Sequence, residues 1–186
     1  MLIANAAQQA ALLGLTTYFT AYMIESHAWD EAKTAPGLAL LGVGAVIGSS
    51  VGGFIAGRAR RLEWLAAISL TSGPVTCLFF VLDVSAWILV AVAFVASVLV
   101  SVSMPVLTTL IMHLAGQSRG TAGGMFTTSS QAGGVVGASA GGLMLSLGGY
   151  PAVGLLCLVA TVLSASVIGL IMRRSPVFQL GGADIG

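Results

Sequence analysis

The ten residues Gly133–Gly142, GGVVGASAGG, decide the fold because their glycines recur every fourth residue. Gly133, Gly137 and Gly141 therefore share one face of any helix that contains them. The same spacing occurs in an earlier stretch, at Gly44, Gly48 and Gly52. Lipid tails give helices little hydrophobic drive to associate, so close backbone approach at small residues supplies much of the packing. Both stretches are predicted to be helix-packing stripes inside a membrane.

The composition around these stripes is that of a membrane protein. Of the 186 residues, 57% are hydrophobic and 7% are charged, whereas about 25% of an ordinary soluble domain is charged. The charge-free stretches are close to the ~20 residues that a helix needs to cross a bilayer. The sequence predicts an all-α polytopic protein rather than a soluble enzyme or nucleic-acid binder. Its six transmembrane helices are expected at Leu2–Ile24, Gly37–Gly57, Trp64–Leu82, Ser85–Leu114, Gly120–Leu147 and Pro151–Met172.

The distribution of charge predicts the orientation. The lysine and arginine residues of one set of connections are all arginines. The other set contains acidic residues and a single basic residue, Lys33. The first set contains Arg58, Arg60, Arg61, Arg119, Arg173 and Arg174; the second contains Glu25, Asp30, Glu31 and Asp83. Because cytoplasmic loops are rich in lysine and arginine, both termini are expected in the cytoplasm, with the chain in the cell inner (plasma) membrane. Residues 1–174 form the membrane domain, and residues 175–186 form a polar cytoplasmic tail.

The two glycine stripes also predict an internal repeat. Each stripe lies in the middle helix of a three-helix unit, the units being about 1–83 and 84–174. Span one leaves the cytoplasm and span four enters it, so the units have inverted topology, which is typical of secondary transporters. The simpler interpretation is that polytopic proteins are rich in glycine in general.

Two motifs of soluble enzymes occur in these spans and lack the context that they need. The segment Gly42–Gly48 looks like a dinucleotide-binding glycine string, which requires a preceding strand. The segment Gly137–Gly141 matches G-x-S-x-G around Ser139, which requires a strand-to-helix elbow and a nearby histidine. An intramembrane enzyme is therefore the weakest hypothesis. No cofactor or metal site is predicted, and no acidic residue within a span offers a proton relay.

Three passages resemble a known family. They are Tyr18–Tyr22 (YFTAY) with Pro36–Leu41 (PGLALL), Gly53–Arg61 (GFIAGRARR), and Arg119–Tyr150, which contains the second stripe. They are similar to the seventh-to-eighth helix passage, the G-x-x-x-D-R-x-G-R-R loop and the eleventh helix of major facilitator superfamily transporters. The resemblance is closest to the carboxy-terminal half of the drug and arabinose efflux permease branch.

Within the loop motif, Gly53, Arg58 and Arg61 match the family pattern. Gly57 stands in place of its aspartate and Arg60 in place of its glycine, which puts a charge-pair gating role in doubt. The family works with twelve helices, and Met1 lies just ahead of what would be the seventh. The resemblance therefore implies a second six-helix half on a separate chain, in a homodimer, or in an upstream region.

The resemblance also implies a central cavity lined by spans one and four. Polar residues lie on one face of span one and on one face of span four. Gln8 lies beside the polar face of span one, and Gln131 lies in span five. The candidate substrate-binding residues are Asn5, Gln8, Gln9, Thr16, Ser97, Ser101, Met104, Thr108 and Gln131. Such amides and hydroxyls suit a neutral or amphipathic small molecule. The alternative is that they form hydrogen bonds between helices, which average about 0.6 kcal/mol per pair.

The leading hypothesis is thus half of a twelve-helix carrier that moves a small organic solute, in the efflux direction, by alternating access across the lipid bilayer. The alternative is a non-transporting membrane interaction protein, or a degenerate transporter fragment, that associates through its glycine stripes.

Overall fold

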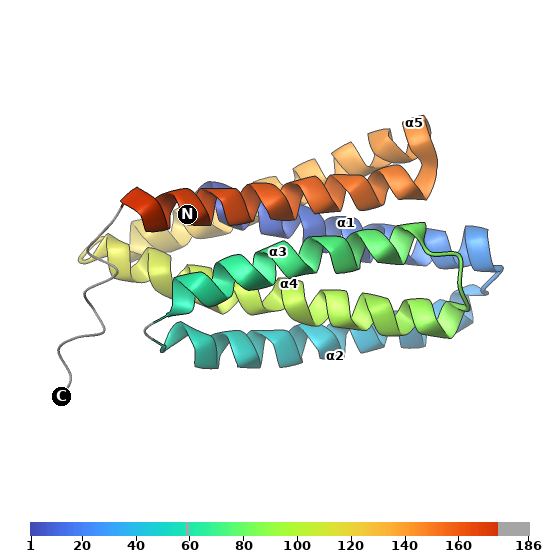
Figure 1. The fold of residues 1–186 in the computed structure, drawn as a ribbon, viewed down its shortest axis with the longest axis horizontal. Coiled ribbons are helices and arrows are strands. Elements are labelled where there is room, and N and C mark those ends of the chain that lie inside the picture. The colour runs from blue at the N-terminus through green and yellow to red at the C-terminus, as the bar shows by residue number, and fades with distance from the viewer. Residues whose placement is uncertain (59, 175–186) are drawn as a thin grey trace.

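The computed structural model describes residues 1–58 and 60–174, and these residues form a bundle of α-helices (Figure 1). Along the described chain the helices are α1 (Leu2–His27), α2 (Glu31–Ala56), α3 (Arg61–Val81), α4 (Ala86–Ala115) and α5 (Arg119–Arg174). The predicted all-α class is confirmed. The predicted tail at 175–186 lies outside the described residues.

Helix α5 has 56 residues and folds back on itself at Gly149 (Figure 1). Gly149 has φ 69° and ψ −164°, a backbone conformation that residues with a side chain rarely adopt. Pro151 follows two residues later. The fifth and sixth predicted spans both lie in α5, on either side of the non-helical Gly149, so the described residues form five helical elements where six separate helices were predicted. Six membrane crossings remain a prediction.

In the described part of the chain, four helices, α2 to α5, are long and apolar enough to cross a membrane. Helix α1 has 26 residues and is not among them, because Asn5, Gln8 and Gln9 dilute its apolar content. Asn5 and Gln8 are almost completely buried, so these two amides lie against other helices and not toward lipid.

The helices pair across the two halves of the sequence. Helix α2 packs chiefly on α4, and α1 packs chiefly on α5, while α3 contacts both α4 and α5. A side chain at Gly48 or Gly52 would come within 3.0 Å of a carbonyl oxygen of α4, that of Val98 or Val102. Gly133 and Gly137 approach α1 in the same way, at the carbonyl oxygens of Ala6 and Ala10. The glycines thus lie at two close helix contacts within the chain.

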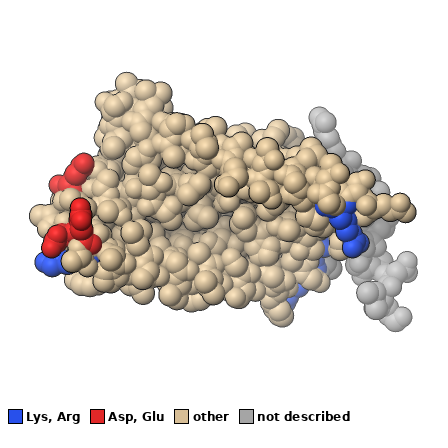
Figure 2. Space-filling view, turned by 180° about the vertical axis from the view of Figure 1, so that it is seen from behind, with Lys and Arg blue, Asp and Glu red and all other residues tan. Residues whose placement is uncertain are grey.

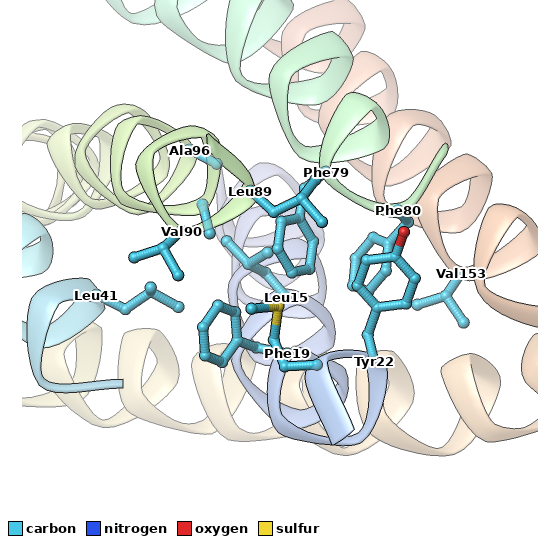
Figure 3. Packing of buried hydrophobic residues seen from close by; sticks show 12 residues of the cluster. Leu15, Phe19, Tyr22, Leu41, Phe79, Phe80, Leu89, Val90, Ala96 and Val153 are labelled. Atoms are coloured by element: carbon cyan, nitrogen blue, oxygen red, sulfur yellow. The ribbon is translucent and has the colours of Figure 1, made fainter. Parts of the chain in front are cut away.

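An aromatic cluster holds one end of α1 against α3 (Figure 3). The rings of Phe19 and Phe79 stack with centroids 5.5 Å apart, and Tyr22 meets Phe79 edge-on at 5.3 Å. Tyr22 also donates a hydrogen bond to the Leu82 carbonyl oxygen (3.2 Å). Tyr150, at the fold-back of α5, donates to Glu25 (2.6 Å). These contacts fix α1, α3 and the fold-back of α5 at one end of the bundle.

Charge separates to the two ends of the bundle (Figure 2). Acidic side chains gather at one end with a basic one beside them, and the other basic side chains seen in this view lie at the opposite end. The start of α1 and the end of α5 lie toward the same end of the bundle (Figure 1).

Candidate solute-binding surface

Asn5 fastens α1 to α5. Its amide nitrogen donates to the hydroxyls of Ser129 (2.7 Å) and Ser130 (2.8 Å) and to the Phe126 carbonyl oxygen (3.3 Å). The side chain is completely buried. The hydroxyls of both serines donate their own hydrogen to the Phe126 carbonyl oxygen. Each serine oxygen therefore accepts its hydrogen bond from the Asn5 amide. Asn5 therefore joins two helices far apart in the sequence.

Gln8, one turn further along α1, joins three helices. Its amide nitrogen donates to Ser69 of α3 (2.6 Å) and to Ser103 of α4 (3.1 Å). Gln8 is 1% exposed, and its carbonyl oxygen has no hydrogen-bond partner in the described residues. The amide lies in the interior of the bundle, at the junction of α1, α3 and α4.

The polar line predicted on α4 divides into a covered part and an accessible part. Ser97 donates to the Leu41 carbonyl oxygen of α2 (2.8 Å), and Ser101 is buried where α4 meets Gly48. Further along the helix, Met104 and Thr108 are half-buried. Thr108 donates to the Met104 carbonyl oxygen (2.8 Å) within the helix, which leaves its lone pairs able to accept a hydrogen bond.

Three further candidates lie near the surface. Gln9 and Thr16 are half-buried on α1, and Gln131 is exposed on α5. Five of the nine candidates are thus accessible from outside the bundle, while Asn5, Gln8, Ser97 and Ser101 lie between helices. The accessible set is Gln9, Thr16, Met104, Thr108 and Gln131. It contains amides, hydroxyls and a thioether, and no charge.

Sequence reasoning missed the serines that hold the two buried amides. Ser69, Ser103, Ser129 and Ser130 occupy ordinary positions in apolar spans. Their roles depend on which helices are neighbours. The spacing of polar residues within one helix could not predict that α1 packs against α3, α4 and α5.

At the two altered positions of the loop motif, Gly57 carries no side chain and Arg60 forms an ion pair with Glu63. Gly53 faces open space, and the Arg58 guanidinium lies over the Phe54 ring, 4.4 Å from its centroid. Arg61 donates to the Ala56 carbonyl oxygen (3.3 Å). Among the described residues, no group of three or more His, Cys, Asp and Glu side chains could hold a metal ion.

Ser139, the serine of the G-x-S-x-G match, donates to the Val135 carbonyl oxygen (2.6 Å) in its own helix. This hydrogen bond is the ordinary local one for a helical serine, and the residue sits in mid-helix without an elbow.

The profile of the family described as Major Facilitator Superfamily matches residues 1–182. The chain belongs to the major facilitator superfamily. Membership makes it a multi-pass membrane protein of a family of secondary transporters and not an enzyme. The bilayer and a transported solute are accordingly its partners. No curated protein and no solved structure matches the chain.

Proposed function

We propose that this major facilitator chain acts as the carboxy-terminal half of an efflux permease of the drug and arabinose branch. It moves a small organic solute by alternating access, crosses the inner (plasma) membrane six times and keeps both termini in the cytoplasm. The half, the branch and the efflux direction rest on the resemblance of the passages around Tyr18, Arg58 and Gly137. The orientation rests on the arginines that lie in the connections predicted to face the cytoplasm.

The observation that carries the proposal is the pair of matched glycine contacts. Gly48 and Gly52 of α2 meet Val98 and Val102 of α4, four residues apart on both helices. Gly133 and Gly137 of α5 meet α1 with the same spacing, at Ala6 and Ala10. In each case the middle helix of one proposed unit packs on the first helix of the other. Two inverted units would produce this exchange, and alternating access in such folds is largely rigid-body motion around a fixed site.

The outer surface of α2 supports a second half as partner. One exposed side of this helix is built of small residues that recur every three or four positions: Gly42, Ala45, Ser49 and Gly53. A shallow hollow of about 450 Å³ lies there, lined by Ala45, Val46, Ser49 and Ser50. Small residues let another helix approach closely, so we assign this side to the second six-helix half. That half is a separate chain, a second copy or an upstream region.

The accessible polar residues support a neutral or amphipathic solute. Gln9 and Thr16 of α1 and Thr108 of α4 offer hydrogen bonds from uncharged groups, and Met104 adds an adaptable apolar contact. Asn5 and Gln8 are given a different role, that of holding the helices of this half together as one unit.

Reconstitution tests the proposal. At fewer than one chain per liposome, we expect no flux of arabinose or ethidium above protein-free liposomes, because one half offers one wall of the cavity. Adding the amino-terminal half of an efflux permease, or raising the number of chains if a second copy is the partner, should restore flux of at least one probe. Robust flux from isolated single chains would overturn the half-transporter proposal.

Cysteine labelling tests the division of the candidate residues. In a variant with Cys77→Ser and Cys157→Ser, we expect Gln9→Cys and Thr108→Cys to react with a water-soluble thiol reagent. Ser97→Cys should react at least ten times more slowly, because that position is covered by α2. Equal labelling rates at positions 9 and 97 would contradict the division. Denatured samples, in which all the introduced cysteines must react, provide the control.

The glycine stripes cannot serve as the interface that the alternative of a non-transporting interaction protein requires. It required association through the glycine stripes, and Gly48 and Gly137 are buried against helices of the same chain. If that alternative were correct, Gly48→Leu and Gly137→Leu would abolish association between chains while leaving each chain folded.

A further inference from the structure

The loop between α2 and α3 and the first turn of α3 contain three arginines and one carboxylate, Glu63. Among residues 1–58 and 60–174, the one ion pair joins the guanidinium of Arg60 to Glu63, and both side chains are exposed. The hydrogen bond to Glu63 raises the pKa of Arg60 further, so Arg60 stays protonated. The two opposite charges of the pair cancel. Arg58 and Arg61 have no carboxylate partner in the described part of the chain. The loop thus carries two uncompensated positive charges.

Arg58 is held at the edge of an apolar surface. Its guanidinium carbon lies 4.4 Å from the centroid of the Phe54 ring, and Phe54 is 67% exposed. Val43, Ile47 and Val51 are exposed along the same side of α2, each four residues from the next. This bulky side is distinct from the side of small residues assigned to the second half. It has the character of a lipid-facing surface, and Arg58 caps the end of it.

Arg61 is half-buried where α2 ends beside α4. One of its terminal nitrogens donates to the Ala56 carbonyl oxygen, and the other lies 3.5 Å from Nδ1 of His113. Because arginine can only donate, Nδ1 accepts, and Nε2–H of the imidazole is left as a further donor. The guanidinium has five N–H groups, so donors remain beyond these two contacts.

We propose that Arg58, Arg61 and His113 bind the phosphate group of an anionic membrane lipid at the arginine-bearing end of the bundle. A guanidinium group can form two parallel N–H···O hydrogen bonds to one phosphate group. Basic pockets between membrane helices hold lipid headgroups. The exposed apolar side of α2 gives the acyl chains a surface directly beside Arg58, whose guanidinium lies over the Phe54 ring. A free phosphate would use the arginines but would gain nothing from Phe54, Val51 and Ile47. This site does not depend on transport.

Tryptophan quenching by brominated lipids tests the site. Trp64 lies in the first turn of α3 and is 51% exposed, so it reports on this end once Trp29→Phe and Trp87→Phe are introduced. The chain is placed in vesicles that contain brominated phosphatidylglycerol or brominated phosphatidylcholine. We expect the anionic lipid to quench Trp64 at a lower mole fraction. Arg58→Gln and Arg61→Gln should each reduce that preference by up to about fivefold.

Two matched controls sharpen the result. Arg60→Gln combined with Glu63→Gln removes the ion pair as a unit and leaves the net charge of the loop unchanged, so this double variant should keep the preference. A variant with Trp29→Phe and Trp64→Phe retains Trp87 at the acid-rich end, where no preference for the anionic lipid is expected. Equal quenching by both lipids at Trp64, or equal loss of preference in the Arg60→Gln/Glu63→Gln variant and in Arg58→Gln, would overturn the proposal. So would loss of the preference when potassium phosphate replaces chloride at equal ionic strength, because the ligand would then be a free anion.

Discussion

Gly48→Ala is expected to destabilise the folded chain by about 1–3 kcal/mol, whereas Gly53→Ala in the same helix is expected to stabilise it by up to ~1 kcal/mol. The two substitutions add the same methyl group. At Gly48 it would lie closer than 3.0 Å to the Val98 carbonyl oxygen, and a backbone atom in a packed helix cannot move aside cheaply. At Gly53 nothing lies within 4 Å, so only the helix preference of alanine over glycine is left.

The second contact provides an independent pair. Gly137 approaches the Ala10 carbonyl oxygen of α1, and Gly124 in the same helix faces open space. Gly137→Ala should therefore lower the midpoint of thermal unfolding in detergent by several degrees, and Gly124→Ala should leave it unchanged or raise it. A rise at both Gly48 and Gly137 would mean that the helices do not approach as closely as described. The proposed relation between the two units would lose its support at the same time.

The glycine spacing could predict that the two stretches are contact surfaces, because spacing determines which residues share a helix face. It could not predict which helix each surface meets. The observed partners, α4 for Gly48 and α1 for Gly137, are set by how distant segments assemble. The alternative of association between chains remained open from the sequence for this reason.

Helix ends were predicted less well than helix positions. Helix α2 begins at Glu31, whereas its span was predicted from Gly37. Hydropathy marks the apolar part of a helix, and α2 continues beyond it through polar residues such as Lys33. The interruption of α5 was easier to predict, because Gly148, Gly149 and Pro151 are strong turn signals.

The candidate site shows the same limit. Rotation by 100° per residue places Ser97, Ser101, Met104 and Thr108 on one face of α4. Whether that face is open depends on α2, which covers Ser97 and Ser101 and leaves Met104 and Thr108 half-buried. Sequence periodicity therefore found the polar line, and only the assembled bundle separates its accessible part from its buried part.

Gln8→Glu is expected to destabilise the bundle strongly at neutral pH, and Gln9→Glu is expected to be tolerated. Gln8 is 1% exposed and donates to Ser69 and Ser103. An ionised carboxylate there could donate to neither serine, and a charge that is buried without a partner is costly. Gln9 has the same chemistry and nearly the same depth, but it is half-buried at the surface of the bundle, where water or headgroups can solvate a charge.

The loss at Gln8 should depend on pH. Burial raises the pKa of the introduced carboxyl in the folded chain above its usual value of about 4.3. The folded state then binds the proton more tightly than the unfolded state does, so the variant is least destabilised below the unfolded pKa. The destabilisation grows as the pH rises from there toward the folded pKa. The protonated acid also regains one O–H donor for one of the two serines.

Thermal unfolding followed by tryptophan fluorescence at pH 4.5 and pH 8 measures this effect, with the original chain at each pH as the reference. We expect the deficit of Gln8→Glu to be several degrees larger at pH 8, and the deficit of Gln9→Glu to be small at both pH values. If the two variants behave alike, water reaches Gln8, and this amide belongs with Gln9 and Thr108 as a residue that a solute can contact. If they differ as expected, the polar residues of α1 have two separate duties. The buried amides hold the half together, and the accessible residues are left to meet the solute.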